Sequence, residues 1–539
     1  MADQPVSPEQ PPNPVQPPDP VPAPDPVRRK LLLAGGFTAA SVALLRGLAP
    51  RATGRDSADS VRVRVVGERT PPGPPAVEGA EPPPPPGHTF ALVLSGGRVI
   101  DPASGFDGIA HVGIDGDRIR AISATPLAAT TVLDVAGLVV APGFIDILSY
   151  EPNPYGVWNK VADGVTTNLG MHGINSTAAS FFELYSSDSH RPPVHYGGAF
   201  DNPHMRSVEA RLPTRPATPA QIELLRRELA EGFAEGWIGL DVEPEYTPWV
   251  TTEEITALAQ VAAEYGMPVF SHIRYSWPGT PEEGSLAAID ELLTVAERTG
   301  VAVHVDHITS MTTHVMEEAL ARLDDARSRG IDVTACVYPY DFWATTLASA
   351  RFADGWQERF RIDYGDLEVP GTGERLTESS FRRYQAENKL VAAHAIPESD
   401  LRLALSTPWV MIGSDAILEE GNNNHPRCSG AFCRTLGRYA RDEAVLTLTD
   451  ALAKMTILPA RRLEARVPAM RRKGRLQIGA DADITVFDPA TVADRATIDD
   501  PARQSVGIEY VVVAGQVVKD RAEMRKDVRP GRPITAQSA

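Results

Sequence analysis

Cysteine is scarce in this sequence. Cys336, Cys428 and Cys433 are the three cysteines among 539 residues. They show neither the even count and spacing of a disulfide framework nor a CxxC metal clip. The number and spacing of the cysteines therefore predict neither a disulfide scaffold nor a thiolate cluster. They do not indicate a cellular compartment.

A surplus of basic residues is also lacking. The chain carries 52 Lys and Arg against 70 Asp and Glu, which gives a net charge of -18. Binding to nucleic-acid phosphates requires Lys and Arg concentrated on one face. We therefore expect no nucleic-acid partner. The length leaves room for one α/β barrel of about 250 residues or more beside further segments.

The apolar segment near the N-terminus is too short for an ordinary membrane span. Arg28 and Arg29 precede a run of 15 residues from Leu31 to Leu45, whereas a membrane helix needs about 20. Paired arginines before a short apolar run are typical of a Tat signal peptide. We predict that residues 1–50 direct export to the periplasm or the extracellular space, with an uncleaved membrane anchor or a chance apolar patch as the alternatives. Residues 51–88, with PPGPP and PPPPP, predict an extended linker.

Short β segments lie on both sides of a long middle region. Residues 89–140 include FALVLSGGRVIDP and TTVLDVAGLVVAPG, and residues 465–525 include DADITVFDPATV and GIEYVVVAGQVV. Runs of Val, Ile and Leu broken by Gly and Asp are typical of strands joined by turns. The two flanks together predict one small composite β domain.

The middle region, residues 141–464, alternates strand and helix. Its strand segments are LVVAPGFID, GVTTNLGMH, PVHYGGAFD, WIGLDVE, MPVFSHIR, VAVHVDH, IDVTACVYPY and WVMIGSD. Amphipathic helical segments such as TEEITALAQVAAEYG lie between them. Eight such units predict a TIM (β/α)8 barrel, whose catalytic groups lie at the C-terminal strand ends. A doubly wound open sheet is the alternative.

One connection is unusually long. Residues 351–390 separate the last two predicted strands. A connection of that length is typical of a lid over the barrel mouth, and a surface excursion without function is the alternative.

Histidines end three of the predicted strands, and an aspartate ends the last one. These residues are His172, His272, His307 and Asp415. Three converging imidazoles would hold Zn²⁺ with one position open for water. Asp415 would then accept the proton of that water. For any histidine alone, a hydrogen-bonded core position is the simpler interpretation.

Strand alternation predicts which of the neighbouring side chains share a face. Val303, Val305 and His307 fall on one face, and His304 and Asp306 fall on the other. We therefore expect His307 to point toward the barrel axis and His304 to pack against the helices.

Several motifs resemble those of the N-acyl-D-amino-acid deacylases, or D-aminoacylases, of the amidohydrolase superfamily. The resemblance covers roughly residues 90–520. Its motifs are GVTTNLGMHG, SHIRY, VDHIT, DVTACVYPYDFWATT, IGSD, HPRCSGAFCRTLGRYARD, KMTILPARRL and GRLQIGADADITVFDPATV. It implies a metal-dependent barrel that hydrolyses an amide next to a carboxylate. It also implies that His272 and His307 are metal ligands and that Asp415 is the catalytic aspartate.

The sequence departs from the family pattern at the ends of the first two predicted strands. Leu148 and Tyr150 stand where most amidohydrolases have an HxH pair, and His172 stands where D-aminoacylases have a cysteine. An imidazole can replace a thiolate on zinc. In addition, no lysine ends a predicted barrel strand, so a carboxylated-lysine bridge is not expected. These features predict one zinc ion per chain, held by His172, His272 and His307.

The expected substrate is a small N-acyl amino acid. Arg274, Tyr340 and Arg427 are candidates to hold its carboxylate, because arginine grips carboxylates with two parallel hydrogen bonds. Each of them has a purely structural role as its alternative, and His425 is either a supporting or a loop residue. Two other functions remain open: a barrel that binds without catalysis, and a cyclic-amide hydrolase of the dihydroorotase or hydantoinase type.

Overall fold

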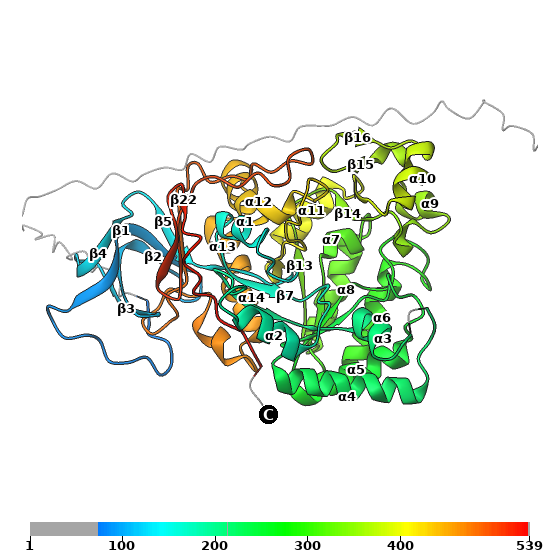
Figure 1. The fold of residues 1–539 in the computed structure, drawn as a ribbon, viewed down its shortest axis with the longest axis horizontal. Helices are drawn as coiled ribbons and strands as arrows, with labels where there is room; N and C mark the ends of the chain where they lie inside the picture. Colours follow the sequence, from blue (N-terminus) through cyan, green and yellow to red (C-terminus); the bar gives the residue numbers. More distant parts are fainter. Residues whose placement is uncertain (1–73, 213, 537–539) are drawn as a thin grey trace, which may run out of the picture. The chain divides into compact units, whose positions relative to one another are not determined.

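The computed structural model describes residues 74–212 and 214–536 (Figure 1). The predicted signal segment, residues 1–50, lies outside the described residues, as does most of the predicted linker. Residues 74–88 form neither helix nor strand. Within the described part of the chain, no helix is both long and apolar enough to cross a membrane.

A nine-stranded sheet is built from both flanks of the chain. Its strand order is β22-β21-β20-β19-β5-β1-β2-β3, and β4 pairs with β1. The flanks join where β19 pairs antiparallel with β5. The strands are β1 (Thr89–Asp101), β2 (Phe106–Asp115), β3 (Arg118–Ser123), β4 (Ala128–Asp134), β5 (Val139–Pro142), β19 (Ile484–Phe487), β20 (Ile508–Val513), β21 (Gln516–Asp520) and β22 (Glu523–Met524).

The middle region forms a ring of parallel strands. These strands are β6 (Phe144–Asp146), β7 (Val165–Gly170), β8 (His195–Gly198), β9 (Phe200–Asp201), β10 (Leu240–Val242), β11 (Val269–Ser271), β12 (Val303–Val305), β13 (Val333–Val337) and β18 (Val410–Ile412). The third barrel strand is divided at Ala199 into β8 and β9. The backbone N–H of Asp415 donates to the carbonyl of Leu148 at 2.8 Å and links the last strand to the first. The predicted TIM barrel with a composite β domain is confirmed.

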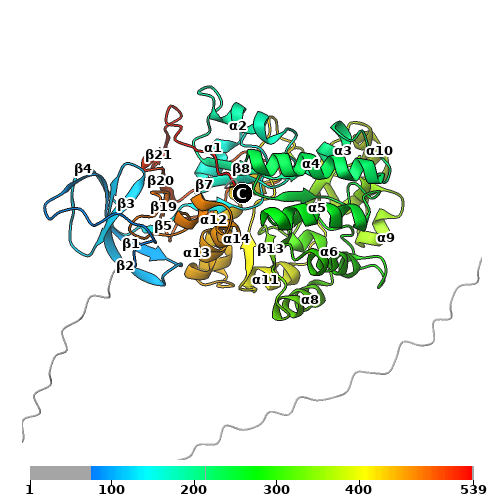
Figure 2. The same ribbon diagram turned by 90° about the horizontal axis from the view of Figure 1, so that it is seen from below.

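Helices surround this ring (Figure 2). They are α1 (Val157–Ala162), α2 (Ala178–Ser186), α3 (Asn202–Val208), α4 (Pro219–Glu235), α5 (Thr252–Tyr265), α6 (Ser285–Thr299), α7 (Ile308–Met311), α8 (Met316–Ser328), α11 (Glu398–Ser406), α12 (Arg427–Arg434), α13 (Leu448–Met455) and α14 (Ile457–Leu463). A π-helical turn, η3 (Thr435–Asp442), extends α12, and a 3-10 turn, η4 (Pro468–Arg472), follows α14.

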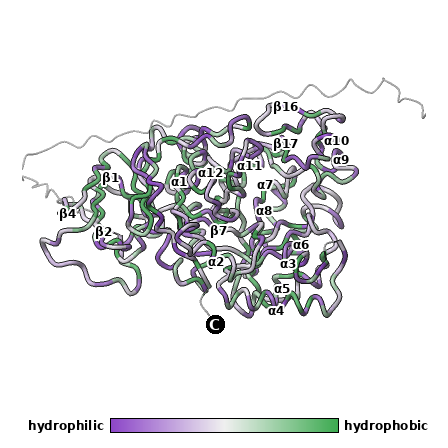
Figure 3. The backbone as a smooth tube through the Cα atoms, in the orientation of Figure 1, coloured by the Kyte–Doolittle hydropathy of each residue, from purple (hydrophilic) through white to green (hydrophobic). Residues whose placement is uncertain are grey.

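Helix α5 illustrates the sequence features that form the barrel helices: a capping residue, a terminating glycine and apolar residues at helical spacing. The Thr251 side chain accepts a hydrogen bond from the N–H of Glu254 and caps its start, and Gly266 ends it with a φ of 69°. Ile255, Leu258 and Ala262 recur at helical spacing and are buried. Hydrophobic and hydrophilic residues alternate along α4 and α5 in Figure 3, so each helix has one face for the barrel and one for solvent.

The predicted insertion is a packed subdomain that begins earlier than residue 351. Its antiparallel sheet has the order β14-β17-β15-β16. The elements are β14 (Trp343–Thr346), η1 (Ala350–Phe352), α9 (Trp356–Phe360), η2 (Tyr364–Asp366), β15 (Leu367–Val369), β16 (Glu374–Arg375), α10 (Glu378–Ala386) and β17 (Leu390–Ala393). Trp356 and Phe381 stack with ring centroids 5.4 Å apart in an aromatic core. Because β14 pairs with β17, the insertion begins at Trp343 and ends at Ala393.

A buried ion pair closes the seam of the barrel. The Lys160 ammonium donates to Asp146 Oδ2 at 2.7 Å and to Ser414 Oγ at 2.6 Å. The N–H of Ser414 donates to the other Asp146 oxygen at 2.9 Å. Asp146 therefore fastens the last strand to the first and is engaged in structure.

Replacing Lys160 with methionine should destabilise the fold strongly. The substitution leaves Asp146 buried without a cation, and such a loss costs about 3–5 kcal/mol of the free energy of unfolding. Urea unfolding measures this. Arg98→Met is the control, because the Arg98–Asp107 ion pair is exposed and should contribute less than about 1 kcal/mol. Equal effects in the two variants would contradict this role for Lys160.

Candidate metal centre and active site

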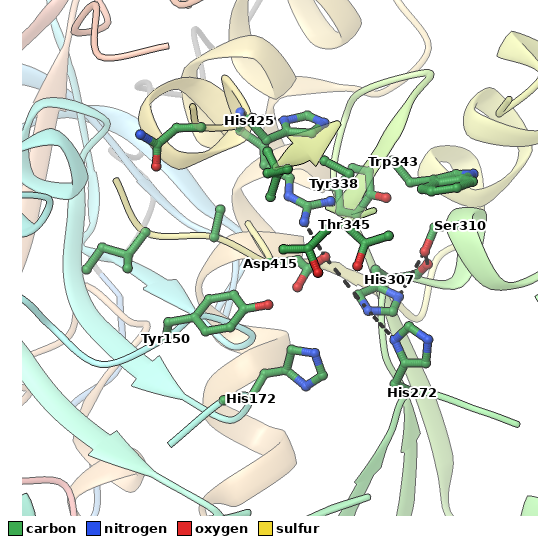
Figure 4. A pocket seen from close by; sticks show the side chains of 18 of the residues that line it. Tyr150, His172, His272, His307, Ser310, Tyr338, Trp343, Thr345, Asp415 and His425 are labelled. Atoms are coloured by element: carbon green, nitrogen blue, oxygen red, sulfur yellow. Dashed lines mark hydrogen bonds and ion pairs between the residues drawn. The ribbon is translucent and has the colours of Figure 1, made fainter. Parts of the chain in front are cut away.

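A cavity of about 380 Å³ opens at the C-terminal ends of the barrel strands. Strand ends supply its floor, and the insertion supplies part of its wall through Trp343, Thr345 and Arg351. Figure 4 shows His172, His272, His307 and Asp415 grouped at its base. The cavity therefore lies where a TIM barrel places its chemistry.

Three histidines from separate strands converge on one point. His172 follows β7, His272 follows β11 and His307 follows β12, with exposed fractions of 4%, 1% and 3%. One ring nitrogen of each lies within 4.8 Å of those of the others. His272 Nδ1 and His307 Nε2 are 3.2 Å apart. Two ligands on a tetrahedral zinc, with bonds of about 2.0–2.1 Å, are about 3.3 Å apart, so this spacing fits a shared cation.

The protonation states of two of these rings suit metal binding. Burial, the largest cause, lowers the pKa of His272 and of His307 well below its usual value. Both are therefore neutral imidazoles, as a metal ligand must be. His172 differs: burial alone would lower its pKa, but nearby carboxylates, first among them Glu243, outweigh burial and raise it.

The backbone at His307 places this ring over the barrel mouth. Strand β12 ends at Val305, and His307 has a φ of 28° and a ψ of 56° at the start of α7. The expectation that His304 packs against the helices is wrong, whereas His307 faces the cavity as expected. His304 lies against Phe270 inside the barrel, with ring centroids 4.7 Å apart, and Asp306 also points inward. Alternation holds within the strand, and His307 joins the inward side because the chain turns after the strand ends.

A hydrogen-bonded network behind the histidines was not anticipated from the sequence. His272 Nε2 donates to Glu245 Oε2 at 2.6 Å, which leaves the lone pair of Nδ1 facing His307. His307 Nδ1 and Ser310 Oγ are 3.0 Å apart. Arg351, from the insertion, donates to the Ser310 carbonyl at 3.0 Å, and its Nε lies 3.5 Å from Glu245. The acidic stretch DVEPE, residues 241–245 at the end of β10, was the available signal for Glu245.

Replacing Glu245 with glutamine should weaken metal binding. Loss of the carboxylate that orients a histidine ligand typically lowers metal affinity by about 10–100-fold. Competition with a chromogenic zinc chelator measures the affinity. Glu291→Gln is the matched control, because Glu291 is also paired with an arginine but lies outside the cavity. Unchanged affinity in Glu245→Gln would contradict the orienting role.

Asp415 lies beside the histidines and carries one anchored oxygen. Its Oδ2 is 2.8 Å from an Arg427 nitrogen and 3.7 Å from His307 Nε2. Its Oδ1 has no hydrogen-bond partner among the described residues. Arg427 also stacks over the Tyr338 ring at 4.4 Å. Asp415 thus presents one unpaired oxygen to the cavity, as a proton acceptor would.

Of the three residues predicted to bind the substrate carboxylate, one lines the cavity and two do not. Arg427 lines the cavity. Arg274 does not, and its guanidinium instead grips Glu291 of α6 with two bonds of 2.8 Å. Tyr340 is buried, its hydroxyl lies 3.4 Å from the Pro426 carbonyl, and it does not line the cavity either. Arg274 and Tyr340 are therefore occupied in structural contacts.

Two further loop residues line the cavity. His425 Nε2 donates to the Phe342 carbonyl at 3.1 Å. Tyr150, at the position of the missing HxH pair, also lines the cavity, and its ring meets His172 edge-on at 5.5 Å. Burial, followed by the charge of Asp415, raises the pKa of Tyr150 well above its usual value. The segment after β6 therefore supplies a Tyr150 phenol that stays protonated. Leu148, from the same segment, is buried in the barrel core.

Comparison with known proteins agrees with this geometry. The model of the Amidohydrolase family matches residues 379–519. An N-acyl-D-glutamate deacylase from Alcaligenes xylosoxydans xylosoxydans is 35% identical over 82% of this chain and 96% of its own length. A D-aminoacylase from the same organism is 32% identical over 80% and 94%. The chain belongs to the D-aminoacylase family of amidohydrolases. The expected resemblance is confirmed, and the protein is a hydrolase of C–N bonds in linear amides.

Solved structures of this amidohydrolase family share the fold. An N-acyl-D-glutamate deacylase from Bordetella bronchiseptica, complexed with zinc and a phosphonate mimic of the tetrahedral intermediate, is 28% identical. It aligns with a TM-score of 0.71 over 83% of this chain and 100% of its own. A D-aminoacylase described as having a binuclear metal centre is 26% identical, with the same TM-score and coverage.

Proposed function

We propose that this amidohydrolase removes the acyl group from N-acyl-D-amino acids with one zinc ion held by His172, His272 and His307. The convergence of these three imidazoles beside Asp415 is the observation that carries the proposal. When bound, zinc would act as a Lewis acid on the amide carbonyl and would lower the pKa of a water molecule. The family members named above support the D-amino-acid class.

The side chains of the site supply proton transfer and stabilisation of the developing negative charge. Asp415 takes the proton from the attacking water and returns it to the departing amine. The Arg427 pairing keeps its Oδ2 in place and leaves Oδ1 directed at the reaction. The Tyr150 phenol, at the cavity wall, is available to donate to an oxygen that gains negative charge. The insertion supplies part of the cavity wall, and exclusion of bulk water there would strengthen the electrostatic interactions of the site.

Two arginines at the cavity suit a carboxylate-bearing substrate. Arg351 and Arg427 both line it and are both nearly buried. Arg351 is committed to Ser276 and Ser310 through one of its terminal nitrogens. Arg427, which has fewer bonds to the protein, is the better candidate to hold the α-carboxylate next to the scissile amide.

A substrate panel tests the proposal. Purified, zinc-loaded protein is assayed on N-acetyl derivatives of D- and L-Glu, Asp, Leu and Met, and on hydantoins and dihydroorotate. We expect release of free amine from D-configured linear substrates. Turnover of the cyclic amides alone would overturn the proposal, and binding of N-acyl amino acids without turnover would favour a non-catalytic barrel.

We also propose that the enzyme is exported through the Tat route. The support is the pair Arg28 and Arg29 before a short apolar run. A fusion of residues 1–88 to a reporter that is active only after export tests this. The Arg28→Lys/Arg29→Lys double variant should stay inside the cell, and export of that variant at the original level would contradict the Tat route.

A further inference from the structure

Positive charge is concentrated in the segment that runs from α14 to η4 and just beyond it. Residues 461–475 hold seven Lys and Arg and a single Glu, although the whole chain has a net charge of -18. Three of these arginines are exposed and pair with no carboxylate in residues 74–212 or 214–536: Arg461, Arg466 and Arg471. Their charge therefore stays available to a partner of opposite charge.

This arginine-rich face lies at the N-terminal end of the barrel, opposite the catalytic cavity. The Arg462 guanidinium donates to the carbonyl of Val303, the first residue of β12, at 2.6 Å. It also pairs at 2.5 Å with Asp332, directly before β13. Arg466 lies against Gly266, which ends α5 ahead of β11. A partner bound to this face would leave the mouth of the cavity free.

Residues near the start of the described structure reach the same face. Ala76, Val77 and Glu78 line a hollow of about 820 Å³ there. The arginines of the hollow are Arg461, Arg471, Arg472 and Arg475. The Val77 N–H donates to the Ile478 carbonyl at 2.9 Å, which holds this stretch against the residues that follow η4. The chain that leads back to the apolar run Leu31–Leu45 therefore starts beside these arginines.

We propose that this arginine-rich face binds the surface of an anionic phospholipid membrane. Guanidinium groups bind phosphate oxygens through paired hydrogen bonds, and each basic residue close to an anionic membrane adds to the attraction. The proposal goes beyond the deacylation and does not depend on it.

The preceding part of the sequence favours a membrane over other anionic partners. Residues 46–73 carry six Arg against three Asp and Glu, and the apolar run of 15 residues comes before them. Their excess of positive charge argues against these residues themselves as the occupant of the hollow, because like charges repel. Nucleic acid matches the arginines in charge but offers no apolar phase for the run at Leu31–Leu45. A membrane accommodates both.

Sedimentation with lipid vesicles tests the proposal. The full chain is mixed at low salt with vesicles of phosphatidylcholine alone or of phosphatidylcholine with phosphatidylglycerol. The apolar run can insert into both, so the measured quantity is the excess binding to the anionic vesicles. We expect the triple variant Arg461→Gln/Arg466→Gln/Arg471→Gln to lower this excess on the order of 100-fold. High salt should abolish it in the natural chain.

A matched control removes the same charge from the other end of the barrel. Arg361, Arg375 and Arg382 are exposed residues of the insertion, which walls the cavity. The triple variant Arg361→Gln/Arg375→Gln/Arg382→Gln should bind the anionic vesicles like the natural chain. Circular dichroism checks that both triple variants fold, as expected for substitutions of exposed side chains.

Several results would overturn the proposal. These are equal binding of the natural chain to both kinds of vesicle, and an unchanged excess in the folded Arg461→Gln/Arg466→Gln/Arg471→Gln variant. Tighter binding to a DNA duplex than to the anionic vesicles would assign the face to nucleic acid instead. Release from the vesicles by inorganic phosphate, but not by chloride of the same ionic strength, would reduce it to a site for a small anion. Vesicle binding is measured without substrate, so its failure leaves the proposed deacylation standing, and the reverse also holds.

Discussion

The His272→Ala chain is expected to lose its catalytic zinc and to hydrolyse N-acyl-D-amino acids on the order of 10⁴-fold more slowly. His272 Nδ1 faces His307 Nε2 at 3.2 Å, so removing this ring removes one of three ligands from a buried site. Loss of a ligand should weaken zinc binding by more than the about 10–100-fold expected for its supporting residue Glu245. Elemental analysis and initial rates at saturating substrate measure both effects.

The control for this variant is His190→Ala. His190 is an exposed loop histidine whose Nδ1 contacts Ser187 and Ser189 and which does not line the cavity, so its removal changes the histidine content but not the cavity. It should keep both zinc and activity. A His272→Ala chain that folds, binds zinc as tightly as the natural protein and retains activity would show that the three imidazoles are not the metal site.

The Asp415→Asn chain is expected to keep its zinc but to lose kcat by about 10²–10⁴-fold. An amide cannot take the proton that the carboxylate removes from water, while the three histidines are untouched. KM should change less than kcat, because the substitution removes a group that acts in the transition state. Steady-state kinetics and metal content together separate this loss from a failure to bind zinc.

Asp494→Asn is the matched control for Asp415→Asn. Asp494 pairs with Arg434 at 2.9 Å, much as Asp415 pairs with Arg427 at 2.8 Å, but it does not line the cavity. It should leave kcat within a few-fold of the natural value. If both variants lost activity equally, a general effect of breaking such a pair would explain the loss, and Asp415 would not be the base.

The positions of the three histidines and Asp415 could be predicted because a barrel gathers the ends of its strands. Finding the strands was sufficient to place His172, His272, His307 and Asp415 near one another, even though they lie far apart in the chain. The side of the strand on which His304 and Asp306 lie could not be predicted in the same way. Side chains alternate between the two faces only while the strand continues, and the strand ends at Val305. The turn that brings His307 to the same side as His304 and Asp306 has no signal in the local amino-acid composition.

Contacts between residues far apart in the sequence account for the other differences between the sequence-based predictions and the structure. Arg274 looked suited to a substrate carboxylate, but Glu291 of α6 satisfies it. Glu245 carried no periodic pattern, and its role emerges only when His272 and Arg351 are seen on either side of it. The insertion begins at Trp343 because β14 pairs with β17 across many intervening residues. Ion pairs and strand pairings of this kind depend on tertiary structure, which single-sequence patterns do not encode.

Arg351 links the wall of the cavity to the loops that carry His272 and His307. It belongs to the insertion that walls the cavity, yet it bonds Ser276 and Ser310, which adjoin the histidine-bearing loops. An engineer who exchanged residues 343–393 for the corresponding segment of a relative, to alter acyl preference, would also remove this clamp.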